Sequence, residues 1–293
     1  MLSSTAGLRL PDADSGGRPA LPVLTGAMIA AAACAAQAII VHVGASAGTV
    51  DHRAPTGVYG PKGSPGKDLA GAPGERGAAF HYVDGSVAAV ADGASVRINQ
   101  AQPVIGPAYH SLVELAVESP DSRQIVEVGW TVDRALDGDD LPHLFVFHWV
   151  DGAPTCYNGC GFVQLSATVH PGEKVTAGTS QAYEIRQSGG DWWVGYGGTL
   201  FGYFPDTLWN GTYTEAGLSQ VFGEVATDGP RSCTMMGDGV FGAKPGSTAV
   251  SQFALINPRV PVPALVPLVT DPLFYNQGKL SDTSFQLGGP GTC

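Results

Sequence analysis

The stretch 124–132 alternates strictly between two sets of side chains, and this pattern constrains the fold more than any other. One set is apolar and falls at every second position: Val126, Val128, Trp130 and Val132. Glu127 and Gly129 belong to the other set. A period of two over this length predicts a β-strand with one buried face. Glu127 would then stand on the second face, where the missing side chain of Gly129 would let a ligand come close.

A second stretch, 220–226, repeats this arrangement, with Glu224 following Gly223 inside a strand-like run. Two strand glutamates raised into one groove would form an acid/base pair, which is the main functional hypothesis that the residues suggest.

Short alternating runs continue from Tyr82 onward, separated by Gly, Pro, Asp and Asn. The runs are 96–99, 112–117, 144–150, 161–165, 182–185, 192–196, 200–204 and 251–255. With 41 glycines and 22 prolines among 293 residues, they predict an all-β protein. We expect an antiparallel β-sandwich of two stacked, curved sheets, similar to a jelly roll. The one helix-like patch is short, at 213–219.

The N-terminal region reads as a targeting segment followed by a tether. In residues 1–47, Arg9 and Arg18 precede an apolar stretch that ends in the small-residue sequence Ala45-Ser46-Ala47. This pattern predicts a cleaved export signal, with an uncleaved membrane anchor as the alternative. Within residues 48–81, glycine recurs at every third position over 57–66 and again, after a slip, over 71–77, with prolines between. This pattern is too short and interrupted for a stable triple helix, so we expect a linker. A secreted protein follows if the signal is cleaved.

Cleavage after Ala47 would remove Cys34 and leave an even number of cysteines, as an exported disulfide protein requires. Among the three possible connectivities, we favour Cys156 with Cys160 and Cys233 with Cys293. The last cysteine closes a proline-rich segment, 258–293, which we expect to pack on the domain as an extended arm.

Composition excludes some partners. The formal net charge is −11, and no basic stripe is available for phosphates, so a nucleic-acid partner is excluded. The histidines form no close pair at ligand spacing, and Cys156 with Cys160 lacks a second pair for zinc, so we expect neither a metal nor a cofactor. We expect a monomer that meets a membrane only if the N-terminal segment is uncleaved.

Several stretches resemble, in order, the neprosin family of glutamic, prolyl-cleaving peptidases. The first is 125–132, around Glu127, and the second is 222–225, around Glu224. The others are 93–99 with 103–104, 156–164, 191–194, 202–205 and 236–239. The resemblance covers roughly residues 83–293 and is specific because the motifs are ordered. It implies a β-sandwich catalytic domain at 82–257. Plant members carry a sizeable activation peptide before this domain, where the chain has only its linker.

The resemblance implies that Glu127 and Glu224 are the two catalytic glutamates. Two carboxyls held close together cannot both ionise easily, so one stays protonated and the pair works in acid. By analogy with related peptidases, Glu224 would be the base that activates water. Glu127 would be the acid and the oxyanion partner. The candidates for substrate-binding residues beside a proline ring are Trp130, Gln164, Trp193, Tyr196 and Tyr203.

Two other functions fit the same residues. A glycoside hydrolase also uses two carboxyls, and a sandwich on a Gly/Pro stalk could be a binding module without activity. The sequence favours a secreted endopeptidase that acts in acid on proline-containing peptides or proteins, and we expect it to cut the bond after proline. Its natural substrate is left open.

Overall fold

The computed structural model describes Lys62, residues 79–106, residues 110–227, Arg231 and residues 233–292. The predicted signal or anchor at 1–47 and most of the predicted linker at 48–81 lie outside these residues. Almost all of the regular secondary structure in these residues is antiparallel β-strand in two stacked sheets, so the predicted β-sandwich is confirmed. In the described chain, no helix has the length and apolar character needed to cross a membrane.

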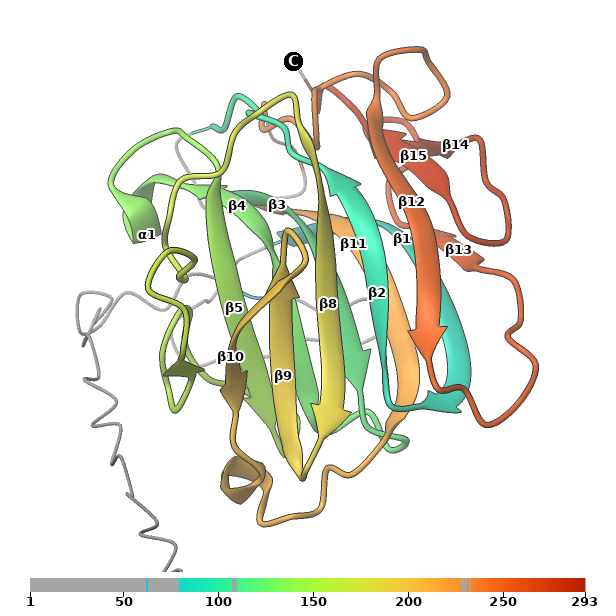
Figure 1. Ribbon diagram of the computed structural model, residues 1–293. Helices are drawn as coiled ribbons and strands as arrows, with labels where there is room; N and C mark the ends of the chain where they lie inside the picture. The colour runs from blue at the N-terminus through green and yellow to red at the C-terminus, as the bar shows by residue number, and fades with distance from the viewer. Residues whose placement is uncertain (1–61, 63–78, 107–109, 228–230, 232, 293) are drawn as a thin grey trace, which may run out of the picture. The chain divides into compact units, whose positions relative to one another are not determined.

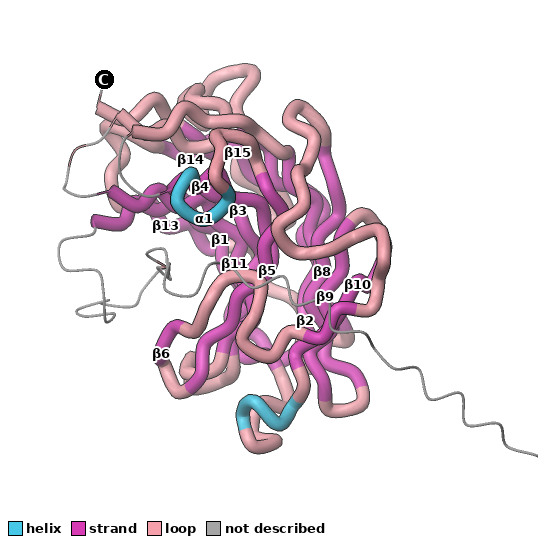
Figure 2. Tube along the Cα trace, turned by 90° about the vertical axis from the view of Figure 1, so that its left-hand side faces the viewer, coloured by secondary structure: helices cyan, strands magenta, loops and turns pink. Residues whose placement is uncertain are grey.

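The first layer is a seven-stranded sheet with the order β13-β1-β11-β3-β4-β5-β6. Its strands lie behind the other sheet in Figure 1 and form the layer at the left of Figure 2. Their bounds are β1 (Ala79–Ala91), β3 (His110–Glu118), β4 (Ile125–Asp133), β5 (His143–Val150), β6 (Ala153–Pro154), β11 (Ala216–Thr227) and β13 (Val266–Val269).

The second layer is an eight-stranded sheet with the order β14-β15-β12-β2-β8-β9-β10-β7. Its bounds are β2 (Gly93–Asn99), β7 (Val163–Gln164), β8 (Ser180–Ser188), β9 (Asp191–Tyr196), β10 (Thr199–Phe204), β12 (Thr248–Ile256), β14 (Asn276–Gly278) and β15 (Phe285–Gly288). In the described chain, two single-turn helices interrupt the strands, α1 (Arg134–Asp137) and the 3₁₀ helix η1 (Asp206–Trp209). The Asp133 side chain caps α1 by accepting from the backbone N–H groups of Ala135 and Leu136.

The main core fills the space between the sheets. Val128 and Trp130 of β4 pack there with Tyr183, Trp192 and Phe201 of the other sheet, all fully buried. The alternation of 124–132 therefore places its apolar set in the core, as predicted.

The other face of the seven-stranded sheet, which we call the outer face, also holds a buried apolar cluster. Its members are Tyr82, Leu112, Ala116, Ile125, Phe145, Phe147, Trp149, Tyr157 and Phe222. Because both faces of this sheet are covered, every residue of β3 and β4 is buried. Polar residues on the outer face are therefore out of water, which makes them expensive to leave unpaired.

Three predictions about chain segments need correction. β1 starts at Ala79, inside the predicted linker, and has 13 residues. The helix-like patch at 213–219 runs into strand β11, which starts at Ala216, because pairing with β1 and β3 overrides its local preference. The C-terminal segment 258–293 is more than an arm, since it supplies β13 to one sheet and β14 and β15 to the other.

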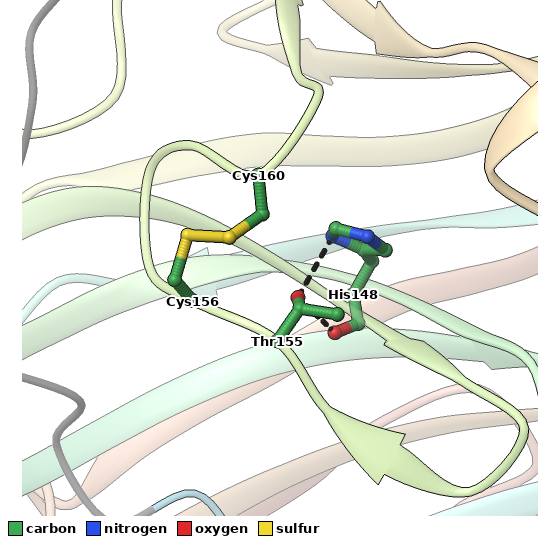
Figure 3. Close-up of a disulfide and its surroundings, with 4 residues drawn as sticks. All are labelled: His148, Thr155, Cys156 and Cys160. Carbon is green, nitrogen blue, oxygen red and sulfur yellow. Dashed lines mark hydrogen bonds between the residues drawn. A yellow bond between two sulfur atoms is a disulfide. The ribbon is translucent and has the colours of Figure 1, made fainter.

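The disulfide between Cys156 and Cys160 is present, with Cα atoms 5.8 Å apart, and it closes the loop after β6 (Figure 3). Thr155 fastens the start of that loop to β5, because its hydroxyl donates to the carbonyl oxygen of His148 at 2.6 Å. The loop carries Tyr157, whose ring lies 4.9 Å from that of Phe147 on the outer face. Cys233 is also disulfide-bonded, but its predicted partner Cys293 lies outside the described residues.

Candidate active site

Glu127 stands on the outer face near the middle of β4. It lies opposite Ala116 of β3 and Phe147 of β5, and its side chain is fully buried. The indole Nε1–H of Trp149 donates to Oε1 of Glu127 at 2.9 Å. Strand alternation thus brings a carboxyl into an apolar, aromatic setting and gives it one neutral hydrogen-bond donor.

Glu224 stands on the same face, on β11. It lies opposite Tyr82 of β1 and Leu112 of β3, and its side chain is also fully buried. Nε2 of His110, the first residue of β3, lies 2.7 Å from Oε1 of Glu224. The two glutamates singled out in the sequence therefore share one face of one sheet.

A third glutamate, Glu114 of β3, lies between them. It is opposite Phe222 on β11 and Gly129 on β4, and it is fully buried. A Cβ atom placed on Gly129 would lie 2.6 Å from Cβ of Glu114. The missing side chain of Gly129 therefore makes room for Glu114, and the expectation that this gap admits a ligand is corrected.

Lys62, which precedes the first strand in the sequence, completes the cluster. Its Nζ donates to Oε1 of Glu114 at 2.7 Å and lies 3.3 Å from Oε2 of Glu127. The same nitrogen lies 5.7 Å from the ring centre of Phe145 and 5.5 Å from that of Phe222. One ammonium group is thus shared by two carboxyls and flanked by two aromatic rings.

The sheet register determines the distance between the Cα atoms of the two predicted catalytic glutamates. β3 lies between their strands, and their positions along it, Leu112 and Ala116, are four residues apart. Ideal sheet spacing puts such Cα atoms about 16 Å apart, with the strand that carries Glu114 between them. That Glu127 and Glu224 share one water molecule stays a prediction.

Burial dominates the protonation of this cluster. It raises the pKa of Glu127 to about 7, because loss of solvation outweighs the opposing effects of the Lys62 charge and the Trp149 hydrogen bond. The pKa of Glu114 is raised well above its ordinary value, first by burial and then by the charge of Glu127. Glu127 therefore keeps its proton in mildly acidic solution, as a general acid must.

Several buried polar atoms on this face have no hydrogen-bond partner among the described residues. Oε2 of Glu114 and the hydroxyl oxygen of Tyr157 are two of them. Burying such groups unpaired is costly, and they remain available to polar atoms of a substrate.

The predicted substrate-binding residues are not brought to this face. Trp130 points into the core between the sheets, where its Nε1–H donates to the carbonyl oxygen of Asn99 at 3.1 Å. Tyr196 packs against the same core from the eight-stranded sheet, and its hydroxyl oxygen lies 2.7 Å from Nε2 of Gln100. Neither side chain can reach Glu127, because the seven-stranded sheet itself lies between.

Trp193, Tyr203 and Gln164 also belong to the eight-stranded sheet. The rings of Trp193 and Tyr203 lie 4.9 Å apart, on the face of β9 opposite to the buried Trp192. Nε2 of Gln164 donates to the carbonyl oxygen of Ser166 at 2.8 Å. We correct the expectation that these residues flank the glutamates. The alternation around Trp193 predicts a strand, but it does not determine to which of the two sheets that strand belongs.

The aromatic residues that do lie beside the glutamates are Tyr82, Phe145, Phe147, Trp149, Tyr157 and Phe222. The sequence reasoning missed their role, together with those of Glu114, His110 and Lys62. One signal was present: Val113, Leu115 and Val117 occupy one face of their run, which leaves Glu114 on the other face. For Lys62 the sequence offered no comparable signal. In the described parts of the chain, no group of three or more His, Cys, Asp or Glu side chains is arranged to hold a metal.

Comparison with known families gives a match to the profile described as Neprosin over residues 107–290, which is more than half of the chain. The matched region includes β3, β4 and β11 and therefore Glu114, Glu127 and Glu224.

Solved structures show weaker similarity. A Scytalido-glutamic peptidase with a peptide-based transition state analog is 8% identical, with a TM-score of 0.39, covering 73% of this chain and 99% of that one. SCP-B, a member of the Eqolisin family of peptidases in complex with the tripeptide Ala-Ile-His, is 7% identical, with the same TM-score and coverage. Chicken galectin 2 is 8% identical, with a TM-score of 0.30, covering 51% of this chain and 100% of that one. At these identities and TM-scores the three structures carry no argument about chemistry.

Proposed function

Since the chain belongs to the Neprosin family of glutamic peptidases, we propose that it is a secreted endopeptidase that cleaves after proline in acid, with Glu127 and Glu224 as its catalytic residues. The observation that carries this assignment is the burial of both carboxyls on one face of one sheet. Glu127 is the acid, because its pKa is raised to about 7 by burial. Glu224 is the base, and His110 orients its carboxyl through the 2.7 Å contact.

The reaction needs only these two groups and water. The Glu224 carboxylate takes a proton from a water molecule as the water oxygen bonds to the peptide carbonyl carbon. At the same time Glu127 gives its own proton to the carbonyl oxygen. In the tetrahedral intermediate that forms, Glu224 passes its proton to the amide nitrogen, and the C–N bond breaks. Glu127 recovers a proton from one hydroxyl group as the new carboxylic acid forms. Both glutamates return to their starting states.

Proline recognition is assigned to the aromatic side chains on the outer face. Phe145, Phe147 and Tyr157 form edge-to-face contacts with centroids 4.9 and 5.3 Å apart, which provides an apolar surface beside the glutamates. A proline ring packs well on aromatic faces and has no N–H group to leave unsatisfied there. These residues replace Trp193 and Tyr203 as the candidates.

Export is supported by the disulfide between Cys156 and Cys160, because such bonds persist in oxidising compartments. A site that works through a protonated Glu127 would suit an acidic extracellular setting.

The test is incubation of the purified full-length protein with a proline-containing peptide, and separately with polysaccharides, at about pH 4 and about pH 8. We expect cleavage after proline, detected by mass spectrometry of the fragments, and faster at the lower pH. Release of reducing sugar without peptide cleavage would identify a glycoside hydrolase, and no turnover of either would identify a binding module.

A further inference from the structure

The outer face of the seven-stranded sheet is unusually rich in buried carboxyls. Asp84 of β1 and Glu118 of β3 extend the row formed by Glu114, Glu127 and Glu224, and all five are at most 1% exposed. Buried carboxylates are stable only when a cation or several donors meet them. Lys62 shows which kind of cation this face accepts.

The contacts of Lys62 describe a complete site for a primary ammonium group. Glu114, Glu127, Phe145 and Phe222 come from four neighbouring strands and converge on Nζ, which leaves Lys62 1% exposed. Glu114 accepts the hydrogen bond, Oε2 of Glu127 lies 3.3 Å away, and two rings add cation–π attraction from the sides. Burial alone would lower the pKa of Lys62, but the charges of Glu114 and Glu127 outweigh it and raise the pKa.

We propose that Glu114, Glu127, Phe145 and Phe222 form a subsite for the ammonium group of a lysine side chain, and that the enzyme prefers substrates with lysine directly after the cleaved proline. The second part rests on the proposed function. The position in the substrate is taken from the sequence, in which Lys62 comes directly after Pro61. Lys62 occupies the subsite as an internal ligand, and a substrate lysine competes with it.

An ammonium group in this subsite is compatible with the chemistry. Its shorter contact is to Glu114, at 2.7 Å, and the contact to Glu127 is 3.3 Å. Burial keeps the pKa of Glu127 at about 7 even with Lys62 in place. Glu127 can therefore still hold its proton in acid while the ammonium group donates its hydrogen bond to Oε1 of Glu114.

The experiment compares synthetic peptides with the sequence of residues 59–66 that carry lysine, norleucine or glutamate at the position of Lys62. Norleucine has nearly the shape of lysine without its charge, so it leaves Glu114 buried and unpaired. We expect kcat/KM at about pH 5 to be at least about tenfold higher for lysine than for norleucine, and lowest for glutamate. A difference of less than about twofold between lysine and norleucine would overturn the subsite.

Three variants test whether the preference for lysine comes from this subsite. Glu114→Gln should bring the lysine-to-norleucine ratio close to one, whereas Glu184→Gln on the eight-stranded sheet should leave it unchanged. Lys62→Met should lower KM for the lysine peptide, because the internal ligand is gone, and should keep the ratio at about tenfold or more. Loss of the ratio in Lys62→Met would show that the preference does not come from this subsite.

Failure of the proposed function would appear differently, as no cleavage of any of the peptides. Binding then decides the subsite. Calorimetry on Lys62→Met should show that N-acetyl-lysine methylamide binds at least about tenfold more tightly than its norleucine analogue. Equal binding of the two would overturn the subsite independently of catalysis.

Discussion

Trp149 controls the proton on Glu127 at the scale of single residues. Its Nε1–H donates to Oε1 of Glu127 at 2.9 Å, and this hydrogen bond opposes the rise in the pKa of Glu127 that burial causes. Trp149→Phe removes the donor, so the pKa of Glu127 should rise further. Because the proposed reaction needs protonated Glu127, the alkaline limb of the kcat/KM profile should move to higher pH.

The measurement is the pH–rate profile of Trp149→Phe beside that of the wild type. Trp193→Phe is the matched control, since Trp193 lies on the other sheet, and its profile should not move. An alkaline limb that stays in place or moves to lower pH in Trp149→Phe would contradict the assignment of Glu127 as the acid.

Glu127 and Glu224 could be found from the sequence because each lies in a strand pattern of period two. Such a pattern determines on which face of the strand each side chain lies. Glu114 lies in a similar pattern, but only its apolar neighbours were used to predict that strand. Lys62 could not be predicted, because its contacts join positions 52 and 65 residues apart in the chain. Such pairings depend on how the strands assemble and leave no local pattern.

At the scale of elements, Gly129 sets how closely β3 and β4 can lie at the site. A Cβ atom there would approach the backbone carbonyl oxygen of Val113 to 2.3 Å and Cβ of Glu114 to 2.6 Å. Gly129→Ala should therefore force the strands apart and lower the free energy of unfolding by about 1–3 kcal/mol or more. Chemical denaturation measures this loss, and kcat/KM should fall as well.

Gly159→Ala is the control, because an added Cβ atom would lie 3.5 Å from Sγ of Cys156, an ordinary contact. It should change stability by less than about 0.5 kcal/mol. Equal stability of Gly129→Ala and the wild type would show that β3 and β4 are not packed as described.

The predictability of the strands follows from their setting. β4 and β11 have regular alternation and were predicted within a few residues. β1 was missed because small and polar residues such as Gly85 and Ser86 blur its pattern. β14 and β15 are short and lie at and next to the edge of their sheet, where the pairing of β15 with β12 and of β14 with β15, rather than composition, defines them. Edge strands of this kind carry little signal of their own.

At the scale of the whole molecule, the buried glutamates should make stability depend on pH. The folded pKa of Glu127 is about 7, above the value of 4.5 for an ordinary glutamate. A raised folded pKa contributes stability that is fully present below about pH 4.5 and is lost as pH rises through about 7. For Glu127 alone the loss is about 3 kcal/mol.

Urea denaturation at about pH 4.5 and about pH 7.5 should show this fall in the free energy of unfolding. Glu127→Gln cannot ionise, so its stability should fall less over the same range. A wild-type protein that becomes more stable across this interval would contradict the protonated state assigned to Glu127.

The central claim is that Glu127 and Glu224 together hydrolyse the peptide bond. The most direct test is to measure kcat for a proline-containing peptide at about pH 5 in the variants Glu127→Gln and Glu224→Gln. Each substitution preserves shape and hydrogen-bonding capacity but removes the titrating group, so each should lower kcat by about a thousandfold while circular dichroism stays that of the wild type. Glu184→Gln should retain full activity. If either glutamate variant, correctly folded, keeps more than about a tenth of the wild-type kcat, that residue is not part of the catalytic pair.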